Sequence, residues 1–233
     1  MSRKAVRVVT IDGPSGSGKG TIGRLLAQKL EWHYLDSGAL YRLVALAALR
    51  RNLDFRDAAS LAATAAGLDA RFTPAAAGER VYLEGADVSS ELRTERAGDA
   101  ASKVAAVPEV LTALLKRQRD FAVPPGLVAD GRDMGTVVFP DALLKVVLTA
   151  SAEARAMRRH KQLKEKGIDV SLPDLSWDIA QRDARDANRT VAPFKPAPDA
   201  YVVDSTSLTP EEVVAHILNR LEGVGVVSGR AKG

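Results

Sequence analysis

The chain has 233 residues, of which 46% are hydrophobic, so it can bury one full core, as a single domain with an insertion. It contains no cysteine and three scattered histidines, which excludes a disulfide framework and a thiolate metal site. The net charge of +4 suits anionic ligands such as nucleotides or nucleic acid, although an excess of this size is usually a solvated surface. Residues 1–5 do not resemble a secretory signal, and no apolar run is long enough for a membrane span, so we expect a cytoplasmic protein.

The N-terminal region contains a phosphate-binding pattern. A β-branched run over residues 7–11 ends in a glycine-rich turn that opens into a periodic segment over residues 21–30. Between them, Gly13-x-x-x-x-Gly18-Lys19 fits the P-loop pattern. Glycines let successive backbone N–H groups converge on phosphate oxygens, and the helix that starts here points its positive dipole end at the same anion. A loop that only turns a strand into a helix is the simpler alternative, but both flanks that the motif requires are present.

The position after Lys19 departs from this pattern. Gly20 stands where Ser or Thr would normally hold Mg²⁺, and Thr21 follows about 100° further round the helix. We therefore expect the Thr21 hydroxyl to meet another oxygen, such as one on the α-phosphate. Mg²⁺ would then be held mainly through water and nearby carboxylates.

Strands and helices alternate along the chain, which predicts an α/β fold with a parallel, doubly wound sheet. The expected strands of this sheet cover residues 7–11, 32–35, 127–129, 143–148 and 201–204. The expected helices cover residues 21–30, 39–49, 54–65, 97–106, 108–121, 152–166, a segment opening at Pro173, and 210–222. Residues 68–100 break the alternation, because short strands at 72–73 and 81–83, a turn at 85–87 and a polar edge at 90–95 predict a small β-rich insertion.

Acidic residues follow several of the predicted strands. Ligands of such sheets bind at the carboxyl ends of the strands, so we expect several of Asp12, Asp36, Asp130 and Asp204 to share one rim. Asp130 follows an apolar strand in a position suited to Mg²⁺-bound water beside a P-loop. The alternative for Asp130 is a carboxylate that caps the following turn.

The chain carries more arginine than a nucleotide-hydrolysing switch would need. The residues are Arg42, Arg132, Arg158, Arg159, Arg182, Arg185 and Arg189. Phosphoryl transfer explains them, because its catalysis is largely positioning and charge stabilisation, for which bidentate guanidinium groups are well suited. The basic helix over residues 152–166 is then a candidate lid that closes over phosphates and excludes water, with a solvated basic face as the alternative.

Four stretches of the chain together resemble the bacterial cytidylate kinase family. They are Gly13–Thr21, Leu35–Arg42, Ala129–Thr136 and Arg182–Arg189, and the similarity runs from about residue 8 to residue 221. The resemblance implies the reaction ATP + CMP ⇌ ADP + CDP, with dCMP also accepted and Mg²⁺ required. It also implies a P-loop NTPase-type parallel sheet with helices on both faces, a β-containing monophosphate-binding insertion and a helical lid.

The same resemblance divides the chain into parts. The core would cover about residues 1–67, 101–150 and 190–222, the insertion about 68–100, and the lid about 151–189. Residues 223–233 would form a flexible tail. We expect a monomer, because every predicted element has a place in one domain.

The resemblance also assigns roles to individual residues. The ATP phosphates would be held by Gly13, Pro14, Ser15, Gly16, Ser17, Gly18, Lys19, Gly20 and Thr21. The acceptor phosphate would meet Ser37, Tyr41, Arg42 and Arg132, and the ribose would meet Arg182 and Asp186. Cytosine would face Ser102, Asp133 and Arg189, where a carboxylate suits the N4 amino donor. Transition-state charge would be met by Lys19, Arg132, Arg158, Arg159 and Arg182, and Mg²⁺ would be held through water by Asp130.

One position departs from the family pattern. The family usually carries an arginine in the helix after residue 108 as a second cytosine contact, and this chain has Leu111 there. The reaction is unaffected, but we expect discrimination against UMP to be looser than in relatives.

Two other functions are alternatives at this point. One is a P-loop kinase that acts on UMP or another small acceptor. The other is a protein that binds ATP or nucleic acid without transferring phosphate, which only the basic charge supports, since no aromatic-interleaved basic patch appears in the sequence. We therefore expect CMP or dCMP and ATP as partners, with no nucleic-acid or membrane partner.

Overall fold

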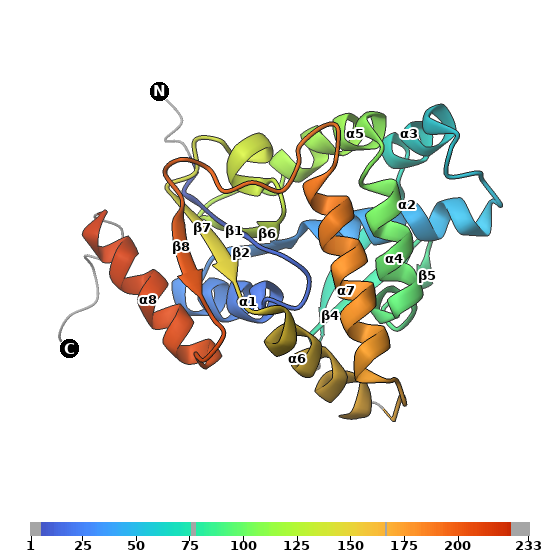
Figure 1. Ribbon diagram of the computed structural model, residues 1–233. Helices are drawn as coiled ribbons and strands as arrows, with labels where there is room; N and C mark the ends of the chain where they lie inside the picture. Colours follow the sequence, from blue (N-terminus) through green and yellow to red (C-terminus); the bar gives the residue numbers. More distant parts are fainter. Residues whose placement is uncertain (1–5, 76–77, 166, 225–233) are drawn as a thin grey trace, which may run out of the picture.

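The computed structural model describes residues 6–75, 78–165 and 167–224. At its centre lies a five-stranded parallel sheet with the order β2-β6-β1-β7-β8 (Figure 1). The strands are β1 (Val8–Asp12), β2 (His33–Asp36), β6 (Leu127–Gly131), β7 (Leu144–Thr149) and β8 (Tyr201–Asp204). This arrangement confirms the α/β fold predicted from the alternation of elements.

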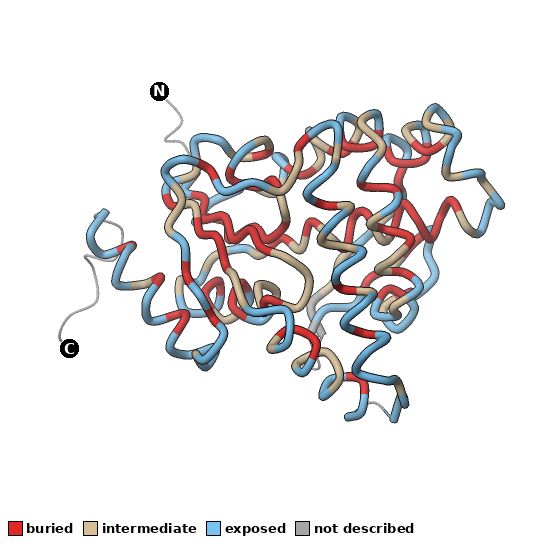
Figure 2. The backbone as a smooth tube through the Cα atoms, viewed as in Figure 1, coloured by how far each residue is buried: buried red, intermediate tan, exposed pale blue. Residues whose placement is uncertain are grey.

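Helices cover both faces of this sheet because side chains alternate along each strand. Val9 and Ile11 belong to a core cluster with α1 (Lys19–Leu30) and α8 (Pro210–Gly223). Val8, one residue away, belongs to the cluster on the opposite face. Figure 2 shows the resulting buried layer along the strands and the inward sides of the helices.

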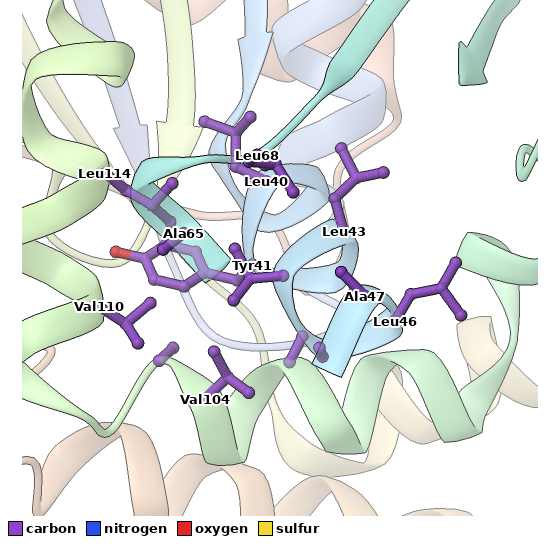
Figure 3. Packing of buried hydrophobic residues seen from close by; sticks show 14 of the residues in the cluster. Leu40, Tyr41, Leu43, Leu46, Ala47, Ala65, Leu68, Val104, Val110 and Leu114 are labelled. Carbon is purple, nitrogen blue, oxygen red and sulfur yellow. The ribbon is translucent and has the colours of Figure 1, made fainter. Parts of the chain in front are cut away.

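The second cluster is built around helix α2 (Ser37–Arg50), whose residues 43–48 are all buried. A helix that is apolar on every side needs neighbours all round. Those neighbours are α3 (Ala58–Ala66), α4 (Glu95–Val104) and α5 (Pro108–Arg119). Figure 3 shows Leu40 and Leu43 of α2 among Ala65, Val104 and Leu114 of these helices. This packing anchors α2, whose first residue directly follows β2.

A separate antiparallel sheet falls within the predicted insertion. It contains β3 (Ala70–Ala75), β4 (Gly78–Leu83) and β5 (Ala86–Asp87), in that order. The prediction of a turn over residues 85–87 is wrong for its last two residues, which pair with β4. Glu84 and Gly85, both with positive φ, make the turn instead.

Helices α6 (Ala152–Glu165) and α7 (Leu172–Ala187) occupy the predicted lid segment. They pack against each other, and α7 also runs along α4 (Figure 1). Ser151 begins α6, because its hydroxyl accepts the Ala154 N–H at 3.1 Å. The predicted cap is therefore confirmed.

Two helices begin at other residues than predicted, because capping side chains set their first residue. The helix expected from residue 54 begins at Ala58, because Asp57 accepts the Ser60 N–H at 3.0 Å. Helix α4 begins at Glu95, two residues early, because Thr94 accepts the Ala97 N–H. Two short turns were not predicted, the 3₁₀ turn η1 (Glu91–Arg93) and the π-helical turn η2 (Met134–Val138).

The expectations for the chain ends can be examined only in part. Helix α8 extends to Gly223, the first residue of the predicted tail over 223–233. Residues 225–233 of that tail, and residues 1–5, lie outside the described residues. None of the helices described is both long and apolar enough to cross a membrane.

Candidate active site

The P-loop lies between the carboxyl end of β1 and the start of α1. Gly16 and Gly18 have φ values of +77° and +92°, a backbone region that other residues rarely adopt. Gly18 is the residue before α1, and no side chain caps the first turn of that helix. Its leading N–H groups therefore remain for a ligand, as an anion site at a helix N-terminus requires. The Lys19 ammonium folds back over the loop and donates to the Pro14 carbonyl at 3.3 Å.

A cleft of about 360 Å³ opens in front of this loop. It brings together most of the predicted site residues, namely Ser15, Gly16, Gly18, Lys19, Gly20, Thr21, Ser37, Tyr41, Arg42, Ser102, Asp130, Arg132, Asp133, Arg159, Arg182, Asp186 and Arg189. We call this the acceptor cleft.

A second cleft, of about 410 Å³, shares five residues with the acceptor cleft, so the two meet at the P-loop and at α6; they are Gly16, Gly18, Thr21, Arg159 and Gln162. We call it the donor cleft; Ser17 and Arg158 line it and are absent from the acceptor cleft. The predicted residues Gly13 and Pro14 line neither, and they shape the loop from behind.

Lys19 sits in a crowded electrostatic environment. Burial, together with the nearby Arg132, lowers the pKa of Lys19 to about 8, against the opposing pull of Asp130 and Asp36. Burial and the neighbouring Asp36 raise the pKa of Asp130 to about 6. The Tyr34 hydroxyl donates to Oδ2 of Asp130 at 2.6 Å and so fixes this carboxylate beside the loop. An anion bound at the P-loop would restore the full charge of Lys19.

Only two of the four strand-end carboxylates share the rim. Asp36 and Asp130 line the acceptor cleft. Asp12 is turned away and accepts the N–H groups of Met134 and Gly135 at 2.9 and 2.8 Å. Burial raises the pKa of Asp12 to about 6 in spite of these bonds. Asp204 lines neither cleft and accepts from Thr206, so the expectation of a shared rim was correct for Asp36 and Asp130 alone.

The first turn of α2 supplies one wall of the acceptor cleft. Asp36 starts the helix by accepting the Ala39 N–H at 3.1 Å. Ser37, Tyr41 and Arg42 then project from one side of the helix, because residues four apart lie above one another. Arg42 lies 3.5 Å from Oδ2 of Asp36, so its guanidinium is held at the rim. Hydroxyl and guanidinium donors in this arrangement suit a phosphate group.

Asp133 presents an unsatisfied acceptor to the cleft. Its side chain is 3% exposed, and Oδ2 has no hydrogen-bond partner among the described residues. Burial raises the pKa of Asp133, although Arg189 and Arg132 act in the opposite direction. A buried acceptor without a partner costs free energy, so this oxygen is suited to receive an N–H from a ligand. Leu111 is buried and lines neither cleft.

Asp186 is the centre of a buried charge network. Its carboxylate accepts from Arg132 at 2.7 Å and from Arg189 at 2.5 Å. Burial alone would raise the pKa of Asp186, but the two guanidinium groups hold it below its ordinary value. Arg132 is thereby fixed at the floor of the cleft, with its Nη1 on the Gly131 carbonyl.

The arginines of α6 and α7 have different partners. Arg158 donates to the carbonyls of Ser205 and Thr206 and lines the donor cleft. Arg159 and Arg182 both bind the carboxylate of Glu95. Burial and the proximity of Arg182 lower the pKa of Arg159, which reflects the density of positive charge at this wall.

Several residues that shape the site were missed by sequence reasoning. Glu95 and Tyr34 gave no sequence signal, because their partners are 64 or more residues away along the chain. Arg155 was noticed only as part of the basic helix. It is 7% exposed and joins Asp183 to the Ser15 carbonyl of the P-loop. Arg155 is buried on α6 together with Ala156 and Leu163. Its position beside these apolar residues was the one sequence signal for its burial.

The chain is similar to known proteins over most of its length. A profile of the family described as cytidylate kinase matches residues 9–223. A cytidylate kinase from Aeromonas salmonicida is 59% identical over 211 residues, which cover 91% of this chain and 92% of that protein. A cytidylate kinase from Bordetella bronchiseptica is 58% identical over 218 residues, covering 94% of this chain and 96% of that protein.

Among solved structures, an uncharacterized protein from Eubacterium ventriosum aligns with a TM-score of 0.52 at 9% identity, over 93% of this chain and 98% of that one. At this identity the match supports the fold alone. The sequence matches, in contrast, extend over nearly the whole chain, from the P-loop to α8. The chain belongs to the cytidylate kinase family.

Proposed function

We propose that this chain transfers a phosphoryl group from ATP to CMP and dCMP, giving ADP and CDP or dCDP. As a member of the family it is a nucleoside monophosphate kinase with ATP as the donor. The observation that carries the choice of acceptor is Asp133, which lines the acceptor cleft and has a buried Oδ2 without a hydrogen-bond partner among the described residues. Cytosine offers an N4 amino donor to such an oxygen, whereas uracil has a carbonyl at that position.

The two clefts give the two nucleotides separate places that meet at the P-loop. We place the adenosine part of ATP in the donor cleft, whose apolar wall includes Ile22, Leu208 and Val213. Its phosphates would follow the shared residues onto the loop amides and Lys19. CMP would lie in the acceptor cleft with its phosphate toward Arg42 and Arg132. This order brings the acceptor phosphate oxygen in line with the γ-phosphate.

The sugar contact of the acceptor remains a prediction. We propose that Asp186 and Arg182 face the ribose, since both line the acceptor cleft. Both oxygens of Asp186 already accept from arginines, so a ribose hydroxyl would share an oxygen with one of them. Ser102, whose hydroxyl accepts from Arg185 at 3.3 Å, still has its own proton to donate to the base.

The residues then act by position and charge. The acceptor is already a phosphate oxygen, so no strong base is required. Lys19 and Arg132 neutralise the charge that spreads over the transferred oxygens, and Arg182 and Arg159 approach from the lid. Arg158 supports the loop after β8 at the donor cleft. The lid excludes water, which would otherwise accept the phosphoryl group.

We also propose Mg²⁺ as the required metal ion. The carboxylates of Asp130 and Asp36 stand beside the P-loop, and hard oxygen donors of this kind suit Mg²⁺. Oδ2 of Asp130 lies 3.5 Å from the point where a residue-20 Cβ would stand, so the glycine leaves space for water between the loop and the carboxylate. When bound, Mg²⁺ would be held by Asp130 and Asp36 through water and would neutralise part of the phosphate charge.

Three further expectations remain proposals. We expect a monomer, which size-exclusion chromatography with light scattering would test. We expect no nucleic-acid partner, and titration with labelled RNA or DNA at physiological salt would test that, since tight, salt-steep binding would contradict it. A cytoplasmic location follows from the proposed use of ATP and free nucleoside monophosphates.

The deciding experiment measures ADP formation from Mg·ATP with CMP, dCMP, UMP, AMP and GMP in separate reactions. We expect the highest turnover with CMP and dCMP. Measurable turnover with UMP would follow from Leu111, which offers no polar group for the base. Absence of turnover with every acceptor, while ATP still binds, would contradict the proposed reaction.

A further inference from the structure

Glu95 joins three helices through one carboxylate. It is the first residue of α4. Nε of Arg159, from α6, donates to its Oε1 at 2.5 Å, and Nη2 of Arg182, from α7, donates to its Oε2 at 3.0 Å. The Glu95 and Arg159 side chains are 29% and 26% exposed, so solvent can reach the pair. Both lid helices are therefore tied to α4 at a single anionic group.

The two arginines that Glu95 binds are also the two that reach the acceptor cleft from the lid helices α6 and α7 among the described residues. A Cβ on Gly98, one turn along α4, would stand 3.1 Å from both terminal nitrogens of Arg182, so this guanidinium lies directly against the helix backbone. Carboxylate and phosphate oxygens compete for the same N–H donors of a guanidinium group. The arginines are thus paired on the rim of a cleft that accepts anions.

We propose that Glu95 is the counter-ion of Arg159 and Arg182 in the nucleotide-free enzyme, and that phosphate oxygens replace it when the substrates bind. The inference rests on the proposed function, because it needs nucleotide phosphates in the acceptor cleft. Glu95 is then a positioning residue that acts through the arginines. It keeps them at the rim without nucleotide, and its displacement is part of the free-energy cost of binding.

The test is the Glu95→Gln variant, which keeps the size of the side chain and removes its charge. A partly exposed ion pair changes an equilibrium constant by about fivefold, so we expect the dissociation constant of ATP, and the KM values for ATP and CMP, to fall by about fivefold. We expect kcat to stay within about twofold, because phosphate and not Glu95 holds the arginines during transfer. Calorimetric titration with ATP gives the first value, and steady-state kinetics give the others.

Asp99→Asn is the matched control. Asp99 lies one turn further along α4 and binds Arg185 of α7 at 2.7 Å, so it also ties α4 to the lid. Arg185 lines neither cleft. The Asp99 charge also acts on Arg182, but Asp99 forms its ion pair with Arg185, so we expect a gain in nucleotide affinity well below the gain from Glu95→Gln. An equal gain in affinity from Asp99→Asn would overturn the inference, because it would assign the effect to looser packing of the two helices.

Other outcomes separate the inference from the proposed function. Unchanged or raised KM in Glu95→Gln, or a loss confined to kcat, would overturn the counter-ion role, while wild-type turnover of CMP would leave the proposed function intact. Failure of the wild type to phosphorylate CMP would contradict the proposed function itself. A thermal unfolding midpoint close to the wild-type value establishes that each variant is folded.

Discussion

At the scale of single residues, the most informative atom is the free Oδ2 of Asp133. It is buried and has no partner among the described residues, and its residue lines a cleft with arginines and hydroxyl groups. A protein keeps such an acceptor at a cost unless a ligand satisfies it. This oxygen can therefore distinguish a base that carries an amino donor, such as cytosine, from a base that lacks it, such as uracil.

We predict that Asp133→Ala weakens CMP binding by about 1–3 kcal/mol, the size of one good base contact. The KM for ATP should change much less, because Asp133 does not line the donor cleft. Steady-state kinetics with each nucleotide varied in turn measure both values. Equal losses for the two nucleotides would argue against a base-reading role.

Lys19 gives a second prediction at this scale. Its pKa of about 8 in the nucleotide-free enzyme means that it is mostly protonated at pH 7 and mostly neutral at pH 9. ATP affinity should therefore fall as pH rises through about 8, by at most tenfold per pH unit. Calorimetric titration with ATP at constant ionic strength measures the change. The titrations run from about pH 6.5 to about pH 9.5, which brackets the Lys19 pKa of about 8.

Lys19→Met is the companion variant. It should abolish turnover and remove the pH dependence of ATP binding over this range, while the unfolding midpoint stays close to wild type. The loop keeps its shape because its glycines and backbone bonds define it. Near-wild-type activity in the variant would contradict the P-loop role of this lysine.

At the scale of elements, the contact between α1 and β2 positions Tyr34, which holds the carboxylate of Asp130. Tyr34 of β2 is held by its hydrogen bond to Asp130 and by the Arg24 guanidinium 5.0 Å above its ring. A Cβ on Gly23 of α1 would stand 2.7 Å from Cε2 of Tyr34. The helix can thus approach the strand only because residue 23 has no side chain.

We predict that Gly23→Ala lowers the free energy of unfolding by about 1–2 kcal/mol. The overpacking cost of about 1–3 kcal/mol exceeds the gain in helix propensity of up to about 1 kcal/mol. Chemical denaturation measures the change. Gly223→Ala at the end of α8 is the control, since no neighbouring atom of the described residues lies within 4 Å of its added Cβ, and it should not be destabilised. A Gly23→Ala protein as stable as this control would show that Tyr34 moves aside freely.

At the scale of the whole molecule, the site is assembled from distant parts of the chain. The P-loop lies near the N-terminus, Asp130 and Asp133 lie at and just beyond the end of β6, and Arg159 and Arg182 come from helices α6 and α7. Among the residues described, no three His, Cys, Asp or Glu side chains converge as a metal site. The proposed Mg²⁺ would be held by Asp130 and Asp36 together with the nucleotide, and we expect the metal ion to bind with ATP.

This arrangement predicts the effect of metal removal. Excess EDTA should abolish turnover and leave the unfolding midpoint of the nucleotide-free protein unchanged, because no folding energy comes from a bound ion. Added Mg²⁺ should restore activity in full. A clear fall of the unfolding midpoint in EDTA would point to a structural metal ion instead. Turnover followed in parallel with thermal unfolding provides both measurements.

The amino-acid sequence determined the features that depend on neighbouring residues. The P-loop was predictable because its function lies in the backbone of Gly13–Lys19 and in the strand and helix beside it. The parallel sheet followed from the alternation of elements. The Ser151 cap depends on a hydrogen bond between residues only three positions apart in the chain. The motif around Asp130 and Asp133 could be located for the same reason, since it directly follows an apolar strand.

Only the tertiary structure decided which side chains of distant segments meet. Asp12 and Asp130 both end central strands, yet Asp12 turns to the N–H groups of η2, while Asp130 faces the P-loop. Glu95 and Asp99 lie one turn apart on α4, and only Glu95 binds arginines of the cleft. Local sequence carries no information on such choices. They depend on strand order, helix packing and burial, which fix the distance and the dielectric environment between charges far apart in the chain.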